Sequence, residues 1–83
     1  MQNKTTNYDV LLDYLQSKYK RITIGKKELS NELGISLSTL DLYMKKGMGI
    51  PSYKKLGDKP NSRVIFNITD VAEFLLSNKI ETL

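Results

Sequence analysis

Residues 26–46 read KKELSNELGISLSTLDLYMKK, and this stretch decides the fold. Its pattern predicts two short helices, over residues 26–33 and 37–46, joined by a tight turn. Gly34 ends the first helix because it adopts a positive φ angle at little cost. Ser36 is suited to cap the second helix, since its side-chain oxygen can accept a hydrogen bond from a free amide of the first turn.

The apolar residues of this stretch fall on one side of each expected helix. Leu29 and Leu33 are four residues apart and share a face, and Leu40 continues the apolar surface in the second helix. Two helices that cross through a short glycine turn form a helix-turn-helix. This motif favours DNA binding, and the alternative is a helical corner with no role at DNA.

Composition limits the classes of function. A chain of 83 residues predicts one small domain, residues 1–83. The absence of cysteine and histidine excludes a disulfide scaffold and a Cys/His zinc site, and it removes the commonest general base. No glycine-rich phosphate loop or nucleophile–base pair is visible, so we expect neither an enzyme nor a cofactor. With no long apolar run and no signal-peptide core, the sequence predicts a cytoplasmic protein without a membrane segment.

Positive charge is segregated along the chain. The net charge is +4, and two blocks rich in cations, residues 18–27 and 45–63, alternate with acidic segments. The first block holds Lys18, Lys20, Arg21, Lys26 and Lys27, and the second holds Lys45, Lys46, Lys54, Lys55, Lys59 and Arg63. Such segregation suits a polyanion as partner.

An N-terminal helix is expected over residues 7–19. Thr6 followed by Asp9 resembles a capping box. The expected apolar face comprises Tyr8, Leu11, Leu12, Leu15 and Tyr19. Val10 and Tyr14 widen this face, either for packing against the remaining helices or for self-association. The five residues before the helix are polar and are expected to be disordered.

A β-branched triplet, residues 22–24, predicts a short extended segment that leads into the helix at residue 26. Thr23 or Gly25 is expected to cap that helix. After the second helix of the motif, Gly47, Gly49 and Pro51 prevent further helix.

A β-hairpin is expected next. Residues 52–56 and 63–67 are predicted strands, and residues 57–62 between them are dense in turn formers. Val64 and Phe66 should share one face of the second strand. The long, polar, positively charged loop is what a wing beside a helix-turn-helix would look like.

A last helix is predicted over residues 70–78. Thr69 is expected to cap it, with Asp70 and Glu73 in its first turn, where the helix dipole favours acids. The expected inner face is Val71, Phe74 and Leu75, and the expected end is at Asn78 and Lys79.

The order of these elements resembles a known family. Residues 22–76 are similar to the small excisionase and AlpA-type regulators of phages and integrative elements, which are related to the DNA-binding half of MerR proteins. The resemblance is carried by Leu29-Ser30, Leu33 to Ser36, Leu40, Lys45 to Gly47, Ile50-Pro51, Leu56-Gly57, Arg63 to Phe66, Thr69-Asp70 and Phe74-Leu75.

The resemblance implies a mainly α fold with a β-hairpin, a winged helix-turn-helix. Residues 22–78 would form this unit, and residues 1–21 would be a helical extension that the family lacks. The family implies sequence-specific binding of double-stranded DNA by a small transcriptional regulator of a phage, plasmid or integrative element. Two alternatives are a recombination directionality factor and a protein-interaction module with the same fold.

The chain departs from the family pattern in the second helix of the motif. Leu37, Asp41 and Leu42 stand where basic or long polar residues are common. They weaken the expectation of dense phosphate contacts. They still permit base contacts, because a carboxylate accepts from cytosine N4 and an aliphatic group meets a thymine methyl. The join over residues 47–51 is also longer than usual.

The hypothesis for binding places the second helix in the major groove and the hairpin loop at the adjacent backbone or minor groove. The residues expected at DNA are Ser36, Leu37, Ser38, Asp41, Leu42, Lys45, Lys46, Lys54, Lys55, Lys59, Asn61, Ser62 and Arg63. Ser36 is chiefly a helix cap. Leu37 could instead pack in the core, Asp41 could pair with Lys45 one turn on, and Arg63 could be a surface charge that stabilises the hairpin.

Tight binding is expected to need more than one copy. One domain of this size buries about 600–1,000 Å² on DNA, near the lower end for specific binding. We therefore expect a homodimer, cooperative assembly on repeated sites, or a protein partner such as an integrase or a polymerase subunit.

Overall fold

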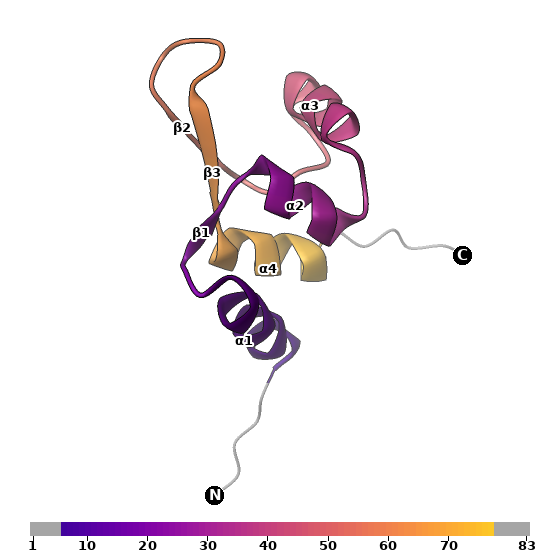
Figure 1. The fold of residues 1–83 in the computed structure, drawn as a ribbon. Helices are drawn as coiled ribbons and strands as arrows, with labels where there is room; N and C mark the ends of the chain where they lie inside the picture. Colours follow the sequence, from indigo (N-terminus) through magenta and orange to yellow (C-terminus); the bar gives the residue numbers. More distant parts are fainter. Residues whose placement is uncertain (1–5, 78–83) are drawn as a thin grey trace, which may run out of the picture.

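The computed structural model describes residues 6–77 (Figure 1). Within this range the chain forms four helices and one antiparallel sheet of three strands in the order β1-β3-β2, a mostly helical α+β arrangement. The elements are α1 (Asn7–Tyr19), β1 (Thr23–Ile24), α2 (Lys26–Leu33), α3 (Leu37–Lys46), β2 (Lys54–Leu56), β3 (Arg63–Asn67) and α4 (Ile68–Ser77). Figure 1 shows α3 and the β2–β3 hairpin at one end, α1 at the other, and α2 and α4 between them.

The bounds predicted for α2 and α3 are confirmed. Gly34 ends α2 with a φ angle of 71°, in the left-handed region that glycine favours. The Ile35 N–H donates to the Ser30 carbonyl over 3.0 Å and closes the turn. The Ser36 hydroxyl accepts from the Thr39 N–H over 3.1 Å, as expected of a helix cap.

The predicted N-terminal helix and its capping box are also confirmed. Asp9 N–H donates to the Thr6 hydroxyl over 3.1 Å, and Thr6 N–H donates to the Asp9 carboxylate over 3.4 Å. Lys20 ends the helix with a φ angle of 56°, and its N–H donates to the Gln16 carbonyl over 2.8 Å. Helix α1 packs against α4.

The hairpin matches the prediction in β3 and in the length of the loop. Val64 and Phe66 are buried on one face, as expected. Strand β2 is shorter than predicted, because its ladder with β3 begins at Lys54 and not at Ser52. Tyr53 lies outside the ladder, and its ring packs against Phe66 with 5.5 Å between the ring centroids.

The extended triplet before α2 does more than lead into that helix. Strand β1 pairs with β3 in antiparallel register, Thr23 opposite Asn67 and Ile24 opposite Phe66. Gly25 is the N-cap of α2, and Thr23 is not. The Gly25 N–H donates to the Glu28 carboxylate over 2.9 Å, so a side chain from the first turn of α2 binds the backbone of the N-cap residue.

The predicted cap of the last helix is wrong. Helix α4 begins at Ile68, so Thr69 lies inside the helix. The cause is tertiary: β3 passes directly into the helix, and the Ile68 N–H donates to the Ile22 carbonyl over 2.9 Å. Asp70 lies in the first turn as predicted, but Glu73 lies beyond it. The predicted end at residues 78–79 and the predicted disorder of residues 1–5 concern residues outside the described range.

One hydrophobic core joins every described element except β2. Its buried residues are Leu15 of α1, Ile24 of β1, Leu29 of α2, Leu40 of α3, Val64 and Phe66 of β3, and Ile68, Val71 and Ala72 of α4. The three residues of β2 are exposed. Among residues 6–77, none of the helices combines the length and the apolar character that crossing a membrane requires.

Candidate nucleic-acid interface

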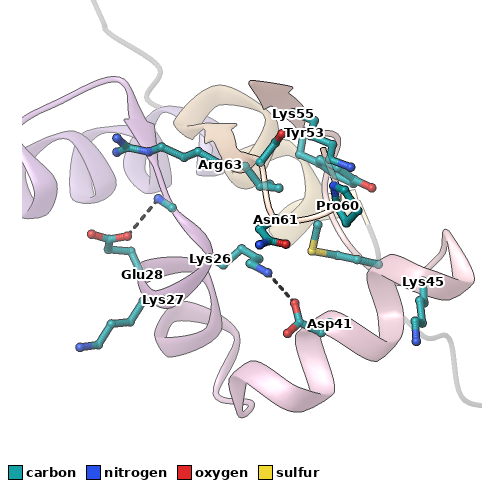
Figure 2. Close-up of a pocket in the computed structure, with 14 residues that line it drawn as sticks. Lys26, Lys27, Glu28, Asp41, Lys45, Tyr53, Lys55, Pro60, Asn61 and Arg63 are labelled. Atoms are coloured by element: carbon teal, nitrogen blue, oxygen red, sulfur yellow. Dashed lines mark hydrogen bonds and ion pairs between the residues drawn. The ribbon is translucent and has the colours of Figure 1, made fainter. Parts of the chain in front are cut away.

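An open groove of about 880 Å³ lies between the start of α2, helix α3 and the hairpin (Figure 2). We call it the basic groove. It is lined by Gly25, Lys26, Lys27, Glu28, Asp41, Met44, Lys45, Tyr53, Lys55, Pro60, Asn61, Ser62, Arg63 and Val64. Figure 2 shows α2 and α3 on one side of it and the hairpin residues on the other.

The charge of the basic groove is positive. Five of its lining residues are lysine or arginine and two are acids, a difference of +3. Both acids are paired: Asp41 with Lys26 over 2.7 Å and Glu28 with Arg21 over 2.8 Å. Burial by itself would raise the pKa of Glu28, but hydrogen bonds from backbone amides, with the nearby Arg21 guanidinium, hold it below its ordinary value. The Glu28 carboxylate therefore stays ionised at the start of α2.

Six of the thirteen residues predicted at DNA line the basic groove. They are Asp41, Lys45, Lys55, Asn61, Ser62 and Arg63. The other seven, Ser36, Leu37, Ser38, Leu42, Lys46, Lys54 and Lys59, lie outside it. Figure 2 shows Arg63 extending from the hairpin toward the start of α2.

The outward face of α3 continues from the groove. The five residues of this face that were expected at base edges are all exposed: Leu37, Ser38, Asp41, Leu42 and Lys45. The alternative that Leu37 packs in the core is wrong, because Leu37 is 43% exposed, while Leu40 one turn on is fully buried. Leu42 is 48% exposed.

Lys54 and Lys55 are adjacent but serve different faces of the hairpin. Lys55 lines the basic groove. Lys54 lines a small hollow on the other side, with Ser52, Tyr53, Ile65, Asn67 and Asp70. The alternation of side chains along a strand causes this separation.

Two predicted serines have structural roles. The Ser36 hydroxyl, besides capping α3, lies 3.0 Å from the Thr39 hydroxyl. The Ser62 hydroxyl accepts from the Lys59 N–H over 3.0 Å and so holds the hairpin loop. Lys59 is exposed at that loop and Ser62 is partly covered.

Asp41 makes a contact that the sequence did not predict. Its carboxylate pairs with Lys26 at the start of α2, so the alternative of an ion pair with Lys45 is wrong. The signal was present, because two lysines in the first turn of a helix oppose the helix dipole, and an acid brought close by the fold offsets that cost. Lys27, Met44, Tyr53 and Pro60 also line the groove, although their positions in the sequence did not predict it, because only the fold brings them together.

The two cationic blocks differ in their pairing. All three ion pairs of residues 6–77 take their cation from the first block: Lys18–Glu32, Arg21–Glu28 and Lys26–Asp41. Within the same range the second block makes no ion pair. It consists of Lys45, Lys46, Lys54, Lys55, Lys59 and Arg63.

A second polar cluster, which we call the Glu32 network, lies on the side of α2 that faces α1. Glu32 accepts from the ammonium of Lys18 over 2.6 Å, from the hydroxyl of Tyr14 over 3.2 Å and from the hydroxyl of Tyr19. The Glu32 side chain is only 7% exposed. The cluster therefore ties α1 to α2 through one nearly buried carboxylate.

The Glu32 network shifts the ionisation of its members. Burial would raise the pKa of Glu32, but the hydrogen bonds from Lys18, Tyr19 and Tyr14 outweigh it and hold that pKa below its usual value. Burial, and then the bond to Glu32, raises the pKa of Tyr19 to about 12. The pKa of Lys18 is raised chiefly by its hydrogen bond to Glu32. At neutral pH the network thus holds the Glu32 carboxylate, the Lys18 ammonium and the neutral phenol of Tyr19.

Comparison with known proteins adds no relative: no family model, no curated protein and no solved structure matches this chain significantly.

Proposed function

We propose that this chain is a winged helix-turn-helix protein that binds double-stranded DNA in a sequence-specific manner and acts as a small transcriptional regulator of a phage, plasmid or integrative element. One observation carries the proposal: the six cations of residues 45–63 make no ion pair within residues 6–77. Three of them, Lys45, Lys55 and Arg63, surround a groove beside an exposed helix face. Cations left without acids around a concave surface favour a polyanion ligand.

In the proposed complex α3 lies in the major groove with its exposed face toward the bases. On that face serine offers a hydrogen-bond donor or acceptor, aspartate offers an acceptor, and leucine offers an apolar contact. These are three of the ways in which side chains read base edges. The hairpin loop reaches the neighbouring backbone or minor groove. The basic groove between them then receives the intervening phosphates.

The magnitudes suit a modest single-copy affinity. Four to six phosphate contacts give a slope of log affinity against log salt of about −4 to −5. Since one domain buries little surface on DNA, a second copy or a protein partner is proposed for tight regulation. Val10 and Tyr14 of α1, which are 54% and 45% exposed, offer apolar surface for such contacts.

The test is selection of bound duplexes from a random pool by the full chain, followed by sequencing, at two salt concentrations. We expect an enriched motif and an affinity that falls steeply as salt rises. Salt-sensitive binding without enrichment would replace sequence reading with an architectural role. No retention even at low salt would overturn the proposal.

A second candidate function is a protein-interaction module. The exposed side chains of Leu37, Leu42 and Met48, the last 63% exposed, favour it, because apolar groups at or just after α3 suit a protein surface as well as thymine methyl groups. Binding of a partner protein that survives loss of Lys55 and Arg63, in a chain with no measurable DNA affinity, would favour this candidate.

A further inference from the structure

The Lys26–Asp41 ion pair joins the first residue of α2 to the middle of the exposed face of α3. Its Nζ–Oδ1 distance is 2.7 Å, and the two side chains are 37% and 55% exposed. Figure 2 shows the pair across the basic groove from Asn61 of the hairpin loop. Both partners are therefore accessible to a ligand that enters the groove.

Each partner of this pair is suited to bind a different part of a DNA duplex. Lys26 is one of five cations around the basic groove, and an ammonium is attracted to a phosphate. Asp41 shares the outward face of α3 with Ser38 and Lys45. A carboxylate in the major groove is repelled by the phosphates, and it can accept a hydrogen bond from the N4 amino group of cytosine.

We propose that the pair exchanges partners on DNA. Lys26 leaves Asp41 and binds a phosphate, and the released Asp41 carboxylate accepts a hydrogen bond from a cytosine amino group. This inference rests on the proposed function and adds a specificity-determining residue and its regulation. In free protein Asp41 neutralises Lys26. On a duplex that presents only acceptors at that position, the released carboxylate has no donor, so the exchange is unfavourable and the duplex is rejected.

The exposure of the pair makes the exchange feasible. Exposed ion pairs of this kind hold together only weakly, so a phosphate can replace the acid without a large cost. A nearly buried carboxylate such as Glu32, which is held by three donors, could not be released in the same way. Asp41 and Glu32 are thus paired differently, and of these two acids only Asp41 faces the proposed ligand.

The first part of the test measures base preference. The motif selected by the wild type should contain a cytosine that Asp41→Asn no longer prefers, with a loss of discrimination at that position of about fivefold. The matched control is Asp58→Asn, which removes the same charge from the exposed hairpin loop. It should raise affinity for all duplexes and leave the preference at that position unchanged.

The second part is a double-mutant cycle with Lys26→Gln, Asp41→Asn and the double variant, titrated with the selected duplex, which contains the cytosine. If the pair exchanges, Lys26→Gln should weaken binding more in the Asp41→Asn background than in the wild type, because Lys26 is then free before binding. An equal or smaller effect in that background means that the pair persists on DNA and overturns the inference. Thermal unfolding of each variant verifies that the fold is kept.

The two proposals fail in distinguishable ways. If the wild type binds no duplex, both the proposed function and this inference fall in the first titration. If the wild type selects a motif but Asp41→Asn selects the same one, the DNA-binding function stands and the exchange is overturned.

Discussion

The Glu32 network and the basic groove are both clusters of charge around α2, but their charges are used differently. In the network, lysine and two tyrosines converge on one carboxylate that is 7% exposed. In the groove, Lys45, Lys55 and Arg63 have no acidic partner within residues 6–77. The first cluster serves the fold, and the second leaves its charge available to a ligand.

The two cationic blocks of the sequence differ in the same way. Residues 18–27 supply the cation of every ion pair in the described range, and residues 45–63 supply the cation of none. Composition alone presents the blocks as equivalent. Whether a cation is paired depends on which acids the fold brings near it, and helices α1 and α2 bring Glu28 and Glu32 only to the first block.

The largest expected effect concerns the unpaired cations. Lys55→Gln combined with Arg63→Gln should weaken binding to a selected duplex about fiftyfold near 0.1 M salt and make the salt slope about 2 units shallower. The reason is the loss of the two phosphate contacts that the proposed complex assigns to these cations. Binding is measured by fluorescence anisotropy over a series of salt concentrations.

The matched control for that prediction is Lys54→Gln combined with Lys20→Gln. It removes the same net charge, but Lys54 lies on the opposite face of the hairpin and Lys20 ends α1. It should change affinity severalfold less. Equal losses in the two double variants would show that binding depends on net charge and not on the basic groove.

The second effect concerns the paired acid. Glu32→Gln should lower the free energy of unfolding by about 1–2 kcal/mol, since the donors on Lys18 and Tyr19 lose a charged acceptor in a nearly buried place. For a domain of this size that corresponds to a fall in Tm of roughly 4–16 °C. Calorimetry measures the fall.

Asp13→Asn is the control for this change, because Asp13 is an exposed acid of α1 whose side chain makes no hydrogen bond or ion pair within residues 6–77. Its unfolding free energy should stay within about 0.5 kcal/mol of the wild type. DNA affinity should change little in Glu32→Gln. A Glu32→Gln variant as stable as the wild type would contradict a structural role for the network.

The pH dependence of stability should show part of the same effect. The pKa of Glu32 is lowered in the folded state from its usual value of 4.5, so the folded protein binds protons less readily than the unfolded chain. The contribution is therefore present above pH 4.5 and is lost as pH falls through the folded pKa. Chemical unfolding between neutral and acidic pH should show the decline, and Glu32→Gln should flatten it.

Glu28 limits how flat that profile becomes. Its pKa is lowered as well, so a Glu32→Gln variant should keep a smaller acid-dependent decline. An unchanged slope in Glu32→Gln would assign the acid sensitivity to other carboxylates.

Local patterns predicted the elements that local chemistry determines. The turn at Gly34, the cap at Ser36 and the capping box at Thr6 depend on residues within three or four positions of one another. Strand β3 followed from its β-branched and aromatic residues. These predictions were confirmed residue by residue.

The errors occurred where distant segments meet. Strand β1 is a two-residue strand that exists because β3 lies beside it, and the start of α4 is set by a hydrogen bond to Ile22. The Lys26–Asp41 pair and the Glu32 network likewise join residues at least 13 positions apart. No periodicity within a window reveals such contacts, so the sequence could name charged residues for the site but could not tell which were already paired.

The smallest expected effect concerns Leu42 and distinguishes residues of α3 that stabilise the fold from residues that contact bases. Leu42→Ala should change the free energy of unfolding by no more than about 0.5 kcal/mol, because its side chain is 48% exposed and alanine favours helix. Leu40→Ala, on the fully buried face two positions away, should cost about 2–5 kcal/mol. If α3 reads bases, Leu42→Ala nevertheless weakens binding of the selected duplex, and the loss is concentrated at one thymine of the motif, where an apolar contact to the methyl group is removed. A loss spread evenly over all positions would instead indicate that Leu42 holds α3 against a partner surface, and no loss at all would remove it from the interface.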